Sequence, residues 1–250
     1  MSSHFIRFRD SFRARGSARA AALAARFFKT GPGEYGEGDR FLGIKVPVTR
    51  SFLAASDALT EADVLKLLRS PWHEERLLAL LILVRRFQRD EAARAHLMRL
   101  YLANTRWVNN WDLVDSSAPQ LLGAWLLGRD RSPLRRLARS KNLWEQRIAI
   151  VATHAFIRGG DIEETKALCE HFLTHEHDLI HKACGWMLRE MGKVDESALT
   201  GFLDRHAPRL PRTMLRYAIE RLTPEQRRRY MQSPSCPSPS PPPSSASARK

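Results

Sequence analysis

The feature that most constrains the fold of this chain is a pattern that returns every 35–36 residues. Arg76, Arg147 and Lys182 each follow a polar residue and begin a mostly small, apolar stretch, and they stand 71 and 35 positions apart. Trp111 lies halfway between Arg76 and Arg147, and Tyr217 lies 35 residues after Lys182. Both are also expected early in helices. A repeat of this length is typical of an α-solenoid, in which each two-helix unit buries its apolar face against its neighbours.

Helix starts and stops surround these positions, and no sheet is predicted. Ser132-Pro133 and Thr223-Pro224 place a capping residue before a proline, which is typical of a helix start. Gly159-Gly160 predicts a helix end. The Trp, Gly and Tyr pattern of tetratricopeptide repeats is absent. We therefore predict an all-α fold, an α-solenoid of HEAT-like two-helix repeats whose basic concave groove is lined by the repeated positions.

Composition divides the chain into three segments. Residues 1–40 combine an Arg-rich stretch, in which Phe5, Phe8 and Phe12 recur at helical spacing, with a Gly-rich turn over residues 29–40. We expect this basic segment to belong to the same domain as the solenoid, which is predicted for residues 41–232. Residues 233–250 are rich in Pro and Ser and too poor in apolar residues to build a core, so we predict a disordered tail.

The chain is basic, with 41 Lys and Arg against 27 Asp and Glu and a formal net charge of +14. Such an excess favours an anionic partner: nucleic acid, an acidic membrane surface or an acidic protein. Residues 1–30 contribute +6 and residues 233–250 contribute +2, so residues 31–232 keep only +6. Three interpretations of the Arg-rich first segment stay open: a solvated cationic helix face, a clamp on DNA, or an organellar transit peptide.

Cysteine usage, apolar run lengths and histidine spacing disfavour several classes of protein. The three cysteines show no CxxC spacing, which fits a reducing, cytoplasmic compartment better than a disulfide framework. The apolar runs are too short to span a bilayer. Four histidines between Cys169 and Cys184 lack the ligand spacing of zinc sites and are expected in a solvated loop: His171, His175, His177 and His181. We expect no membrane association, no metal and no cofactor.

One segment combines an indole with a carboxylate. Trp111 and Asp115 lie four residues apart on a predicted helix and so share a face, and the same offset from Lys182 gives Trp186. A purine alkylated at N3 or N7 departs as a neutral base, so its excision needs a carboxylate for the sugar cation and the water rather than a general acid. From the spacing alone, a core tryptophan and an aspartate that complements a helix dipole are the favoured interpretation. Asp112 is expected to be a local hydrogen-bond or ion-pair partner.

Four segments, in the same order, are similar to motifs of the AlkD-type DNA alkylation repair glycosylases, a family of HEAT-like repeat proteins. They are Phe41-Leu-Gly-Ile-Lys-Val-Pro47, Trp111-Asp-Leu-Val-Asp115 followed by Pro119 and Gly123, Asn142-Leu-Trp-Glu-Gln-Arg147-Ile-Ala, and Ile180-His-Lys-Ala-Cys-Gly-Trp-Met-Leu-Arg-Glu190. The resemblance covers roughly residues 5 to 230 and excludes the Pro/Ser-rich tail. Asn110 departs from the pattern, because some members of the family carry a tryptophan there.

The resemblance implies a monofunctional glycosylase that hydrolyses the N-glycosidic bond of cationic N3- and N7-alkylpurines in duplex DNA. Such an enzyme leaves an abasic site and works without flipping the base. The resemblance implies that Asp115 stabilises the sugar cation and orients water, that Trp111 and Trp186 flank the damaged nucleotide, and that Arg147 fixes the DNA backbone. Further DNA contacts are expected from groove positions: Arg76, Lys182, Arg189 and Tyr217.

The expected partner is alkylated duplex DNA, bound by a monomer without a small-molecule cofactor. Two alternatives stay open on the same scaffold. One is a non-catalytic α-solenoid that binds damaged, bent or branched DNA, and the other is a protein–protein scaffold. Steep salt dependence of DNA binding separates the DNA-binding proteins from the scaffold, and release of a free base separates the enzyme from the non-catalytic binder.

Overall fold

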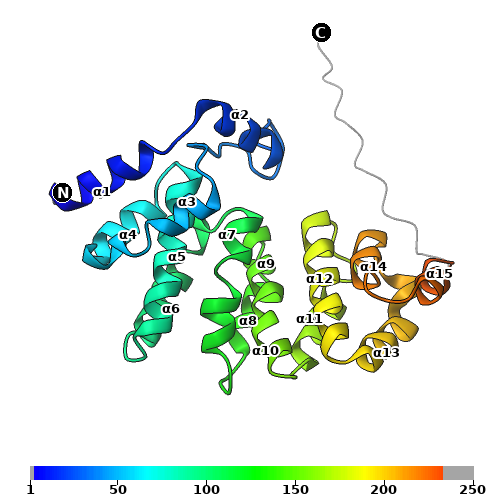
Figure 1. Cartoon of the computed structure of the whole chain (residues 1–250). Coiled ribbons are helices and arrows are strands. Elements are labelled where there is room, and N and C mark those ends of the chain that lie inside the picture. Colours follow the sequence, from blue (N-terminus) through cyan, green and yellow to red (C-terminus); the bar gives the residue numbers. More distant parts are fainter. Residues whose placement is uncertain (1–2, 233–250) are drawn as a thin grey trace, which may run out of the picture. The chain divides into compact units, whose positions relative to one another are not determined.

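The computed structural model describes residues 3–232, and the secondary structure over that range is helical (Figure 1). The one β-type pairing in the described part is an isolated bridge between Arg40 and Trp72. The all-α fold class predicted from the sequence is therefore confirmed. The predicted disorder of residues 233–250 falls outside the described residues, as does Cys236.

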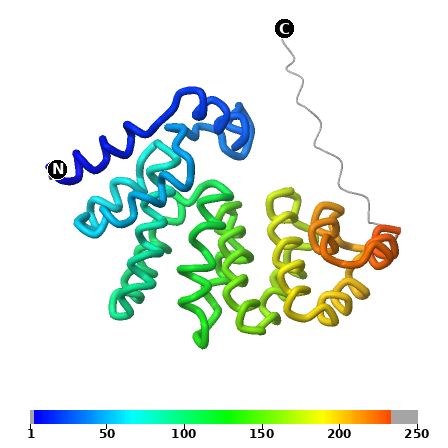
Figure 2. Tube along the Cα trace, in the orientation of Figure 1, coloured from blue at the N-terminus to red at the C-terminus, as the bar shows by residue number. Residues whose placement is uncertain are grey.

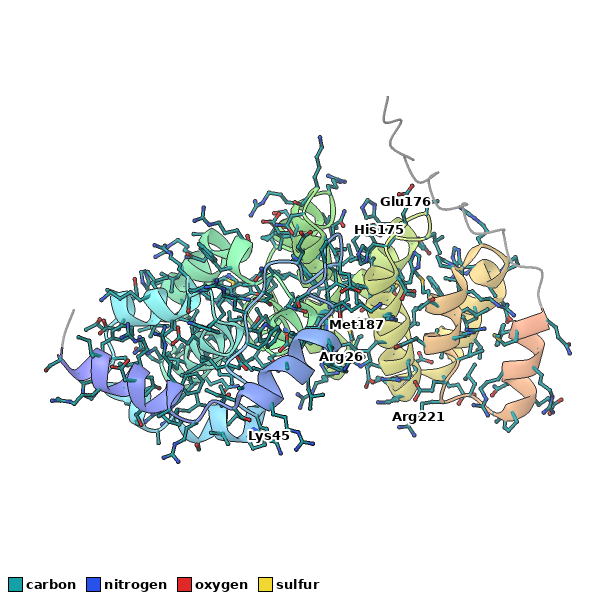
Figure 3. The ribbon with its side chains drawn as sticks, turned by 90° about the horizontal axis from the view of Figure 1, so that it is seen from above. Arg26, Lys45, His175, Glu176, Met187 and Arg221 are labelled. Atoms are coloured by element: carbon teal, nitrogen blue, oxygen red, sulfur yellow. The ribbon has the colours of Figure 1, made fainter. Side chains whose placement is uncertain are left out.

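The chain divides into two compact units after Asp161. Figure 2 traces the backbone through successive helices that are joined by short turns, and Figure 3 shows the same helices with their side chains. The division follows the Gly159-Gly160 turn, where α10 (His154–Arg158) ends as the sequence predicts. Neighbouring helices pack in pairs within each unit, which confirms the HEAT-like two-helix character of the fold.

The basic N-terminal segment belongs to the first unit. Its helices are α1 (Ser3–Arg13) and α2 (Ala18–Phe27). The three phenylalanines at helical spacing in α1 are buried as expected, and Phe8 and Phe12 meet the ring of Phe52 edge-on at 5.8 and 5.1 Å. Arg13 at the end of α1 donates two hydrogen bonds to Glu75, which joins α1 to the next layer.

The rest of the first unit is built around one long central helix, α5 (His73–Arg89). All residues from His73 to Val84 are buried, because α5 packs against helices on several sides. Its neighbours include α4, which begins with a capping box made by Thr60 and Asp63. The remaining helices of this unit are α3 (Val46–Ser51), α4 (Glu61–Leu68), α6 (Arg94–Ala103), α7 (Trp111–Asp115), α8 (Ser132–Ala138) and α9 (Leu143–Ala152).

The short helix α7 continues into a π-helical segment, η3 (Pro119–Gly123), that packs closely against α9. A Cβ atom at Gly123 would lie only 2.2 Å from the carbonyl oxygen of Ala152, so this contact requires glycine. The start of α9 is capped by Asn142, whose side-chain oxygen accepts from the backbone N–H of Trp144 at 2.8 Å. Close contact between η3 and α9 fixes the distance between the helices that carry Asp115 and Arg147.

The second unit is centred on α12 (Asp178–Val194), which packs against α11 (Glu163–His171), α13 (Glu196–His206) and α14 (Arg212–Ala218). The last helix, α15 (Pro224–Gln232), begins at the proline that the sequence indicates. A Cβ atom at Gly185 would lie 2.5 Å from both the Met214 carbonyl oxygen and the Tyr217 Cβ. This glycine therefore allows α12 and α14 to approach each other closely.

The repeated positions of the sequence fall on helices of both units. Arg76, Trp111, Arg147 and Lys182 lie within the first five residues of α5, α7, α9 and α12. Tyr217 was also expected early in a helix, but it is the second-last residue of α14, because this seven-residue helix begins only after Pro211. Among the helices over residues 3–232, none has the length and apolar character that crossing a membrane requires.

Candidate active site

A buried ion pair joins α7 to α9 in the first unit. Arg147 donates from Nε to Oδ1 of Asp115 at 3.0 Å and from its terminal nitrogen to Oδ2 at 2.8 Å. The guanidinium side chain is 6% exposed and the carboxylate side chain is 19% exposed. A bidentate arginine holds a carboxylate in one orientation. The carboxylate therefore has a fixed direction while one part of it still reaches the surface.

The environment of Asp115 changes its acidity. Burial raises the pKa of the carboxyl group above its ordinary value, and the negative charge of Asp112 adds to this. The hydrogen bonds and positive charge of Arg147 oppose the increase without cancelling it. The result is a poorly solvated carboxylate that is more basic than an exposed aspartate, which suits it to accept a proton or to face a developing cation.

Trp111 begins α7, on the same short helix as Asp115. Its ring stacks on Phe28 with 5.2 Å between ring centroids and an angle of 23° between the planes, and meets Phe27 edge-on at 5.9 Å. Phe28 therefore supports one side of the indole. These partners could not be predicted from the sequence, because Phe27 and Phe28 lie more than eighty positions before Trp111 in the chain.

Asn110, where the sequence departs from some AlkD-type proteins, is the N-cap of α7 and is fully buried. Its side-chain oxygen accepts from the backbone N–H of Trp111 at 2.9 Å, and its Nδ2 donates to Asp39 at 3.3 Å. The amide thus satisfies the start of the helix and ties it to the Gly-rich turn. A tryptophan has no side-chain acceptor and could not make this cap.

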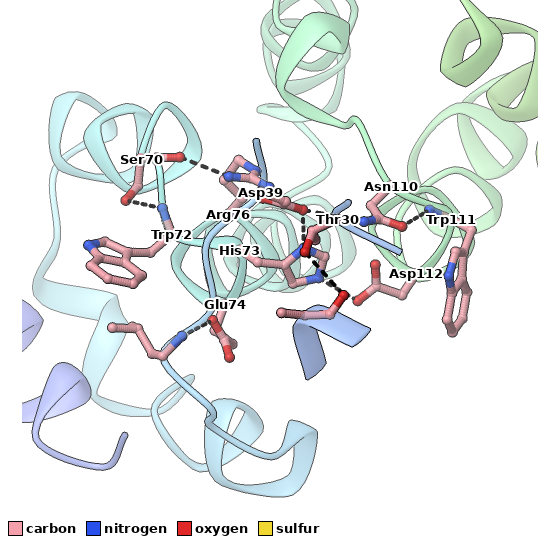
Figure 4. A network of polar contacts seen from close by, with 12 residues as sticks. Thr30, Asp39, Ser70, Trp72, His73, Glu74, Arg76, Asn110, Trp111 and Asp112 are labelled. Atoms are coloured by element: carbon pink, nitrogen blue, oxygen red, sulfur yellow. Dashed lines mark hydrogen bonds and ion pairs between the residues drawn. The ribbon is translucent and has the colours of Figure 1, made fainter. Parts of the chain in front are cut away.

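A network of polar contacts joins α5, the Gly-rich turn and α7 (Figure 4). His73 contacts Asp39 through Nδ1 at 2.9 Å and Asp112 through Nε2 at 2.8 Å. Asp112 was expected to be a local hydrogen-bond or ion-pair partner; it forms such a contact, but with a residue 39 positions earlier in the chain. The sequence did not point to Asp39 or His73, because neither lies in a recognisable motif and they stand 34 positions apart.

Arg76 does not fit the phosphate contact that the sequence suggested. Its side chain is 4% exposed, pairs with Asp39, and donates to the carbonyl oxygen of Ser70 at 3.0 Å. A buried guanidinium in these contacts cannot reach DNA without unfolding its surroundings. We therefore assign Arg76 to the support of the site and leave it out of the proposed DNA contacts.

The expected site residues of the second unit lie on α12 and α14. Trp186 is half-buried and donates from its indole N–H to Glu190 at 3.1 Å. Lys182 pairs with Asp178 at 2.8 Å, and Arg189 pairs with Glu220. Tyr217 is exposed and lies beside α12 at Gly185. Both expected cations thus form intramolecular ion pairs near the protein surface.

Of the four histidines expected in a loop, only His175 and His177 lie in the turn that leads into α12, whereas His171 ends α11 and His181 lies within α12. The Nδ1 atom of His177 accepts from the backbone N–H of Leu179 at 3.1 Å and so caps the helix. His181 contacts the carbonyl oxygen of His175. Over residues 3–232, no group of three or more His, Cys, Asp or Glu side chains is placed to hold a metal ion.

A family model described as DNA alkylation repair enzyme matches residues 8–222 of the sequence. This chain belongs to the DNA alkylation repair enzyme family. The match covers most of the chain and includes both Asp115 and Arg147. The repair of alkylated DNA requires binding to DNA, and the net charge of +14 agrees with such a partner.

A solved structure shows the same fold as this chain. The chain is similar to a structure described as a predicted DNA alkylation repair enzyme from Enterococcus faecalis, with a TM-score of 0.64 and 18% sequence identity. The likeness covers 84% of this chain and 98% of that chain. At this identity it shows the fold alone. No curated protein sequence matches the chain.

Proposed function

We propose that this DNA alkylation repair enzyme is a glycosylase that hydrolyses the N-glycosidic bond of cationic N3- and N7-alkylated purines in duplex DNA. The product is a free base and an abasic site. The observation that carries the proposal is the partly exposed carboxylate of Asp115, held by Arg147 on the helix that begins with Trp111.

The substrate class follows from what the site must supply. An alkyl group at N3 or N7 gives the purine a positive charge. When the bond between C1′ and N9 breaks, its electron pair neutralises that charge and the base leaves as a neutral molecule. No general acid is then required, and the rate depends on stabilising the positive charge that develops on the sugar and on delivering water to C1′.

Asp115 can meet both requirements. Each of its oxygens accepts one hydrogen bond from Arg147, which leaves further lone pairs for the sugar and for water. A negative charge that is largely removed from solvent interacts more strongly with a sugar cation than an exposed one does. As the oxygen of water bonds to C1′, one of its protons passes to a carboxylate whose raised pKa favours accepting it.

We assign to Arg147 the role of orienting Asp115. We prefer this role to the contact with the DNA backbone that the resemblance implies. Both hydrogen bonds from its Nε and its terminal nitrogen are directed at the carboxylate, and its side chain is almost completely buried. The pair resembles other sites in which a planar guanidinium fixes a carboxylate bidentately. Arg147 is therefore a positioning residue.

Trp111 is proposed to flank the damaged nucleotide, because a half-buried indole beside the carboxylate offers a flat, electron-rich surface to a cationic sugar. Roles for Trp186, Lys182, Arg189 and Tyr217 on the second unit stay predictions from the resemblance. Substitution of each by alanine, with DNA affinity and base release measured separately, tests them individually.

The test of the proposed function compares two duplex oligonucleotides that differ only in the charge of one base. One carries a single N7-methylguanine and the other carries hypoxanthine, a neutral base, at the same position. We expect free base and an abasic site from the N7-methylguanine duplex and little or no release from the hypoxanthine duplex. Equal release from both would contradict the proposed role of the cationic leaving group. Tight binding of the methylated duplex without release would favour a non-catalytic DNA-binding protein.

A further inference from the structure

We propose that His73 is a positioning residue for this reaction: as an imidazolium that bridges Asp39 and Asp112, it holds the helix that carries Trp111 and Asp115 in its working position (Figure 4). The proposal rests on the proposed function. It concerns residues of the first unit only, and His73, Asp39 and Asp112 act through α7 rather than on the reacting atoms.

The geometry around His73 requires a protonated ring. Both ring nitrogens face carboxylate oxygens, Nδ1 toward Asp39 at 2.9 Å and Nε2 toward Asp112 at 2.8 Å, and the side chain is 2% exposed. A neutral imidazole has only one N–H to donate, so it would turn a lone pair toward one of the two carboxylates. An imidazolium donates to both.

The charge state agrees with this geometry. Burial by itself opposes a charged ring, but the hydrogen bonds to Asp112 and Asp39 outweigh it and raise the pKa of His73 to about 9. Burial also opposes the ionisation of Asp39, yet its bonds to His73 and Arg76 keep the pKa of that carboxyl below its ordinary value. His73 is therefore protonated and Asp39 ionised at neutral pH.

The other charged groups near His73 are engaged elsewhere. Glu74, the next residue of α5, accepts from the backbone N–H groups of Leu42, Gly43 and Ile44 at 2.8 to 3.2 Å. A cavity of about 210 Å³ next to α2 is lined by residues that include Lys45, His73, Glu74 and Asp112. Neither Glu74 nor Lys45 hydrogen-bonds the ring, so Asp39 and Asp112 are the groups that set its charge.

The cluster reaches the proposed active site along the backbone of α7. Asp112 lies in the first turn of this helix, three residues before Asp115, and Asn110 at its N-cap also donates to Asp39. A helix of five residues is too short to be stable by its own hydrogen bonds. The start of α7 is thus held at two points by the same buried charges.

A second connection runs through stacked rings. The imidazole of His73 stacks on Phe41 with 4.6 Å between centroids and lies 4.9 Å from Phe28. Phe28 in turn stacks on the indole of Trp111. A displacement of the His73 ring would therefore be transmitted to Trp111 through Phe28 and to Asp115 through Asp112.

The experiment measures single-turnover base release from N7-methylguanine duplex between pH 6 and pH 10, with the spontaneous rate subtracted. Because N7-methylguanine loses its own N1 proton within this range, each rate is compared with that of His73→Gln at the same pH. We expect the ratio of the wild-type rate to the His73→Gln rate to fall as the pH rises through about 9, where His73 loses its proton. Asp112→Asn keeps a hydrogen-bond acceptor for Nε2 of His73 but removes one of the two negative charges that face the ring. The pKa of His73 should therefore decrease, and the alkaline fall in the rate should begin about one pH unit lower than in the wild type. His73→Gln should be about tenfold slower at pH 7 and lack that alkaline fall.

His96→Gln is the matched control, because His96 is exposed and pairs with Glu61 away from this cluster. Its rate and pH profile should equal those of the wild type. If His73→Gln, shown to be folded by circular dichroism, keeps the wild-type rate and the same alkaline fall, the proposal is wrong. Because a fall in rate could also reflect loss of folded protein, the fraction folded is measured at each pH.

Nuclear magnetic resonance of the wild-type protein gives a readout that needs neither a variant nor catalysis. We expect the imidazole nitrogens of His73 to report a protonated ring at pH 7, and the indole N–H signal of Trp111 to shift as that ring deprotonates. A neutral His73 at pH 7, or a Trp111 signal that does not follow its titration, would overturn the proposal. Absence of base release by the wild type would contradict the proposed function and leave this readout unaffected.

Discussion

At the scale of single residues, the ion pair between Asp115 and Arg147 holds the proposed catalytic carboxylate in one orientation. Both positions were expected in the site from the resemblance. Their direct pairing was not expected, because the two residues lie 32 positions apart and the sequence gives no distance between α7 and α9. The raised pKa of Asp115 likewise depends on burial, which only the fold determines.

The ion pair leads to a prediction about pH. Arg147→Gln removes the cation that opposes the effect of burial, so the pKa of Asp115 should rise further. Because the ionised carboxylate is the active form, base release should fall as the pH drops through this pKa, and the acidic fall should begin at a higher pH in the variant. Single-turnover rates of base release between pH 4.5 and pH 8 measure this acidic fall. Arg85→Gln, which loses only a surface pair with Asp57, serves as control. The same acidic fall in the wild type and in both variants would contradict the role assigned to Arg147.

Arg76 gives a prediction of the opposite kind, because it supports the fold. Arg76→Ala leaves the buried carboxylate of Asp39 without one of its cations, and breaking a buried pair typically costs about 3–5 kcal/mol of the free energy of unfolding. Urea denaturation measures this loss. The affinity of the folded variant for undamaged duplex should remain within about twofold of the wild type, a factor worth only about 0.4 kcal/mol. Unchanged stability with a much weaker affinity would restore Arg76 as a DNA contact.

At the scale of elements, helix starts were predictable and the support of α7 was not. Pro133, Pro224 and the Asn142 cap act on their own helices, so local sequence is sufficient to place α8, α15 and α9. The partners of α7 come instead from the Gly-rich turn and from the end of α2, far away in the chain. Such long-range contacts leave no periodic pattern in a single sequence.

Phe27 and Phe28 form a matched pair for testing this support. Phe28 stacks on Phe41 and Trp111 and meets His73 at a tilt, whereas Phe27 is 65% exposed and touches Trp111 only edge-on. Phe28→Ala should lower the free energy of unfolding by about 2–3 kcal/mol, somewhat less than a fully buried phenylalanine. Phe27→Ala should cost less than about 1 kcal/mol. Thermal or urea denaturation measures both, and equal losses would show that the stack does not support α7.

His73 also makes the stability of the first unit depend on pH. Its pKa is raised from 6.5 to about 9 in the folded protein, so folding is favoured by its protonation. The contribution of this protonation to the free energy of unfolding is fully present below pH 6.5 and is lost as the pH rises through about 9. At 1.36 kcal/mol for each pKa unit, the contribution is about 3 kcal/mol. We expect the free energy of unfolding to fall over this range in the wild type and much less in His73→Gln. Parallel curves for the two proteins would contradict this linkage.

At the scale of the whole molecule, the repeat period determined the fold class before any contact was known. A pattern that returns every 35–36 residues implies stacked helix pairs, and the family match over residues 8–222 agrees with it. The boundary between the two compact units after Asp161 has no counterpart in the repeat pattern, which runs on through it. The Gly159-Gly160 turn beside it was recognised as a helix end, but a turn does not reveal how many contacts cross it. The predicted basic concave groove stays a prediction.

The central claim, that Asp115 makes this DNA alkylation repair enzyme a glycosylase, is tested most directly by one variant. The measurement is release of free base from a duplex with a single N7-methylguanine by the wild type and by Asp115→Asn, with DNA affinity determined in parallel. The account predicts release by the wild type and at least a hundredfold slower release by Asp115→Asn, about 2.7 kcal/mol of lost transition-state stabilisation, while both proteins bind the duplex with similar affinity. Equal release by the two proteins would contradict the role of Asp115, and no release by the wild type would contradict the glycosylase activity itself.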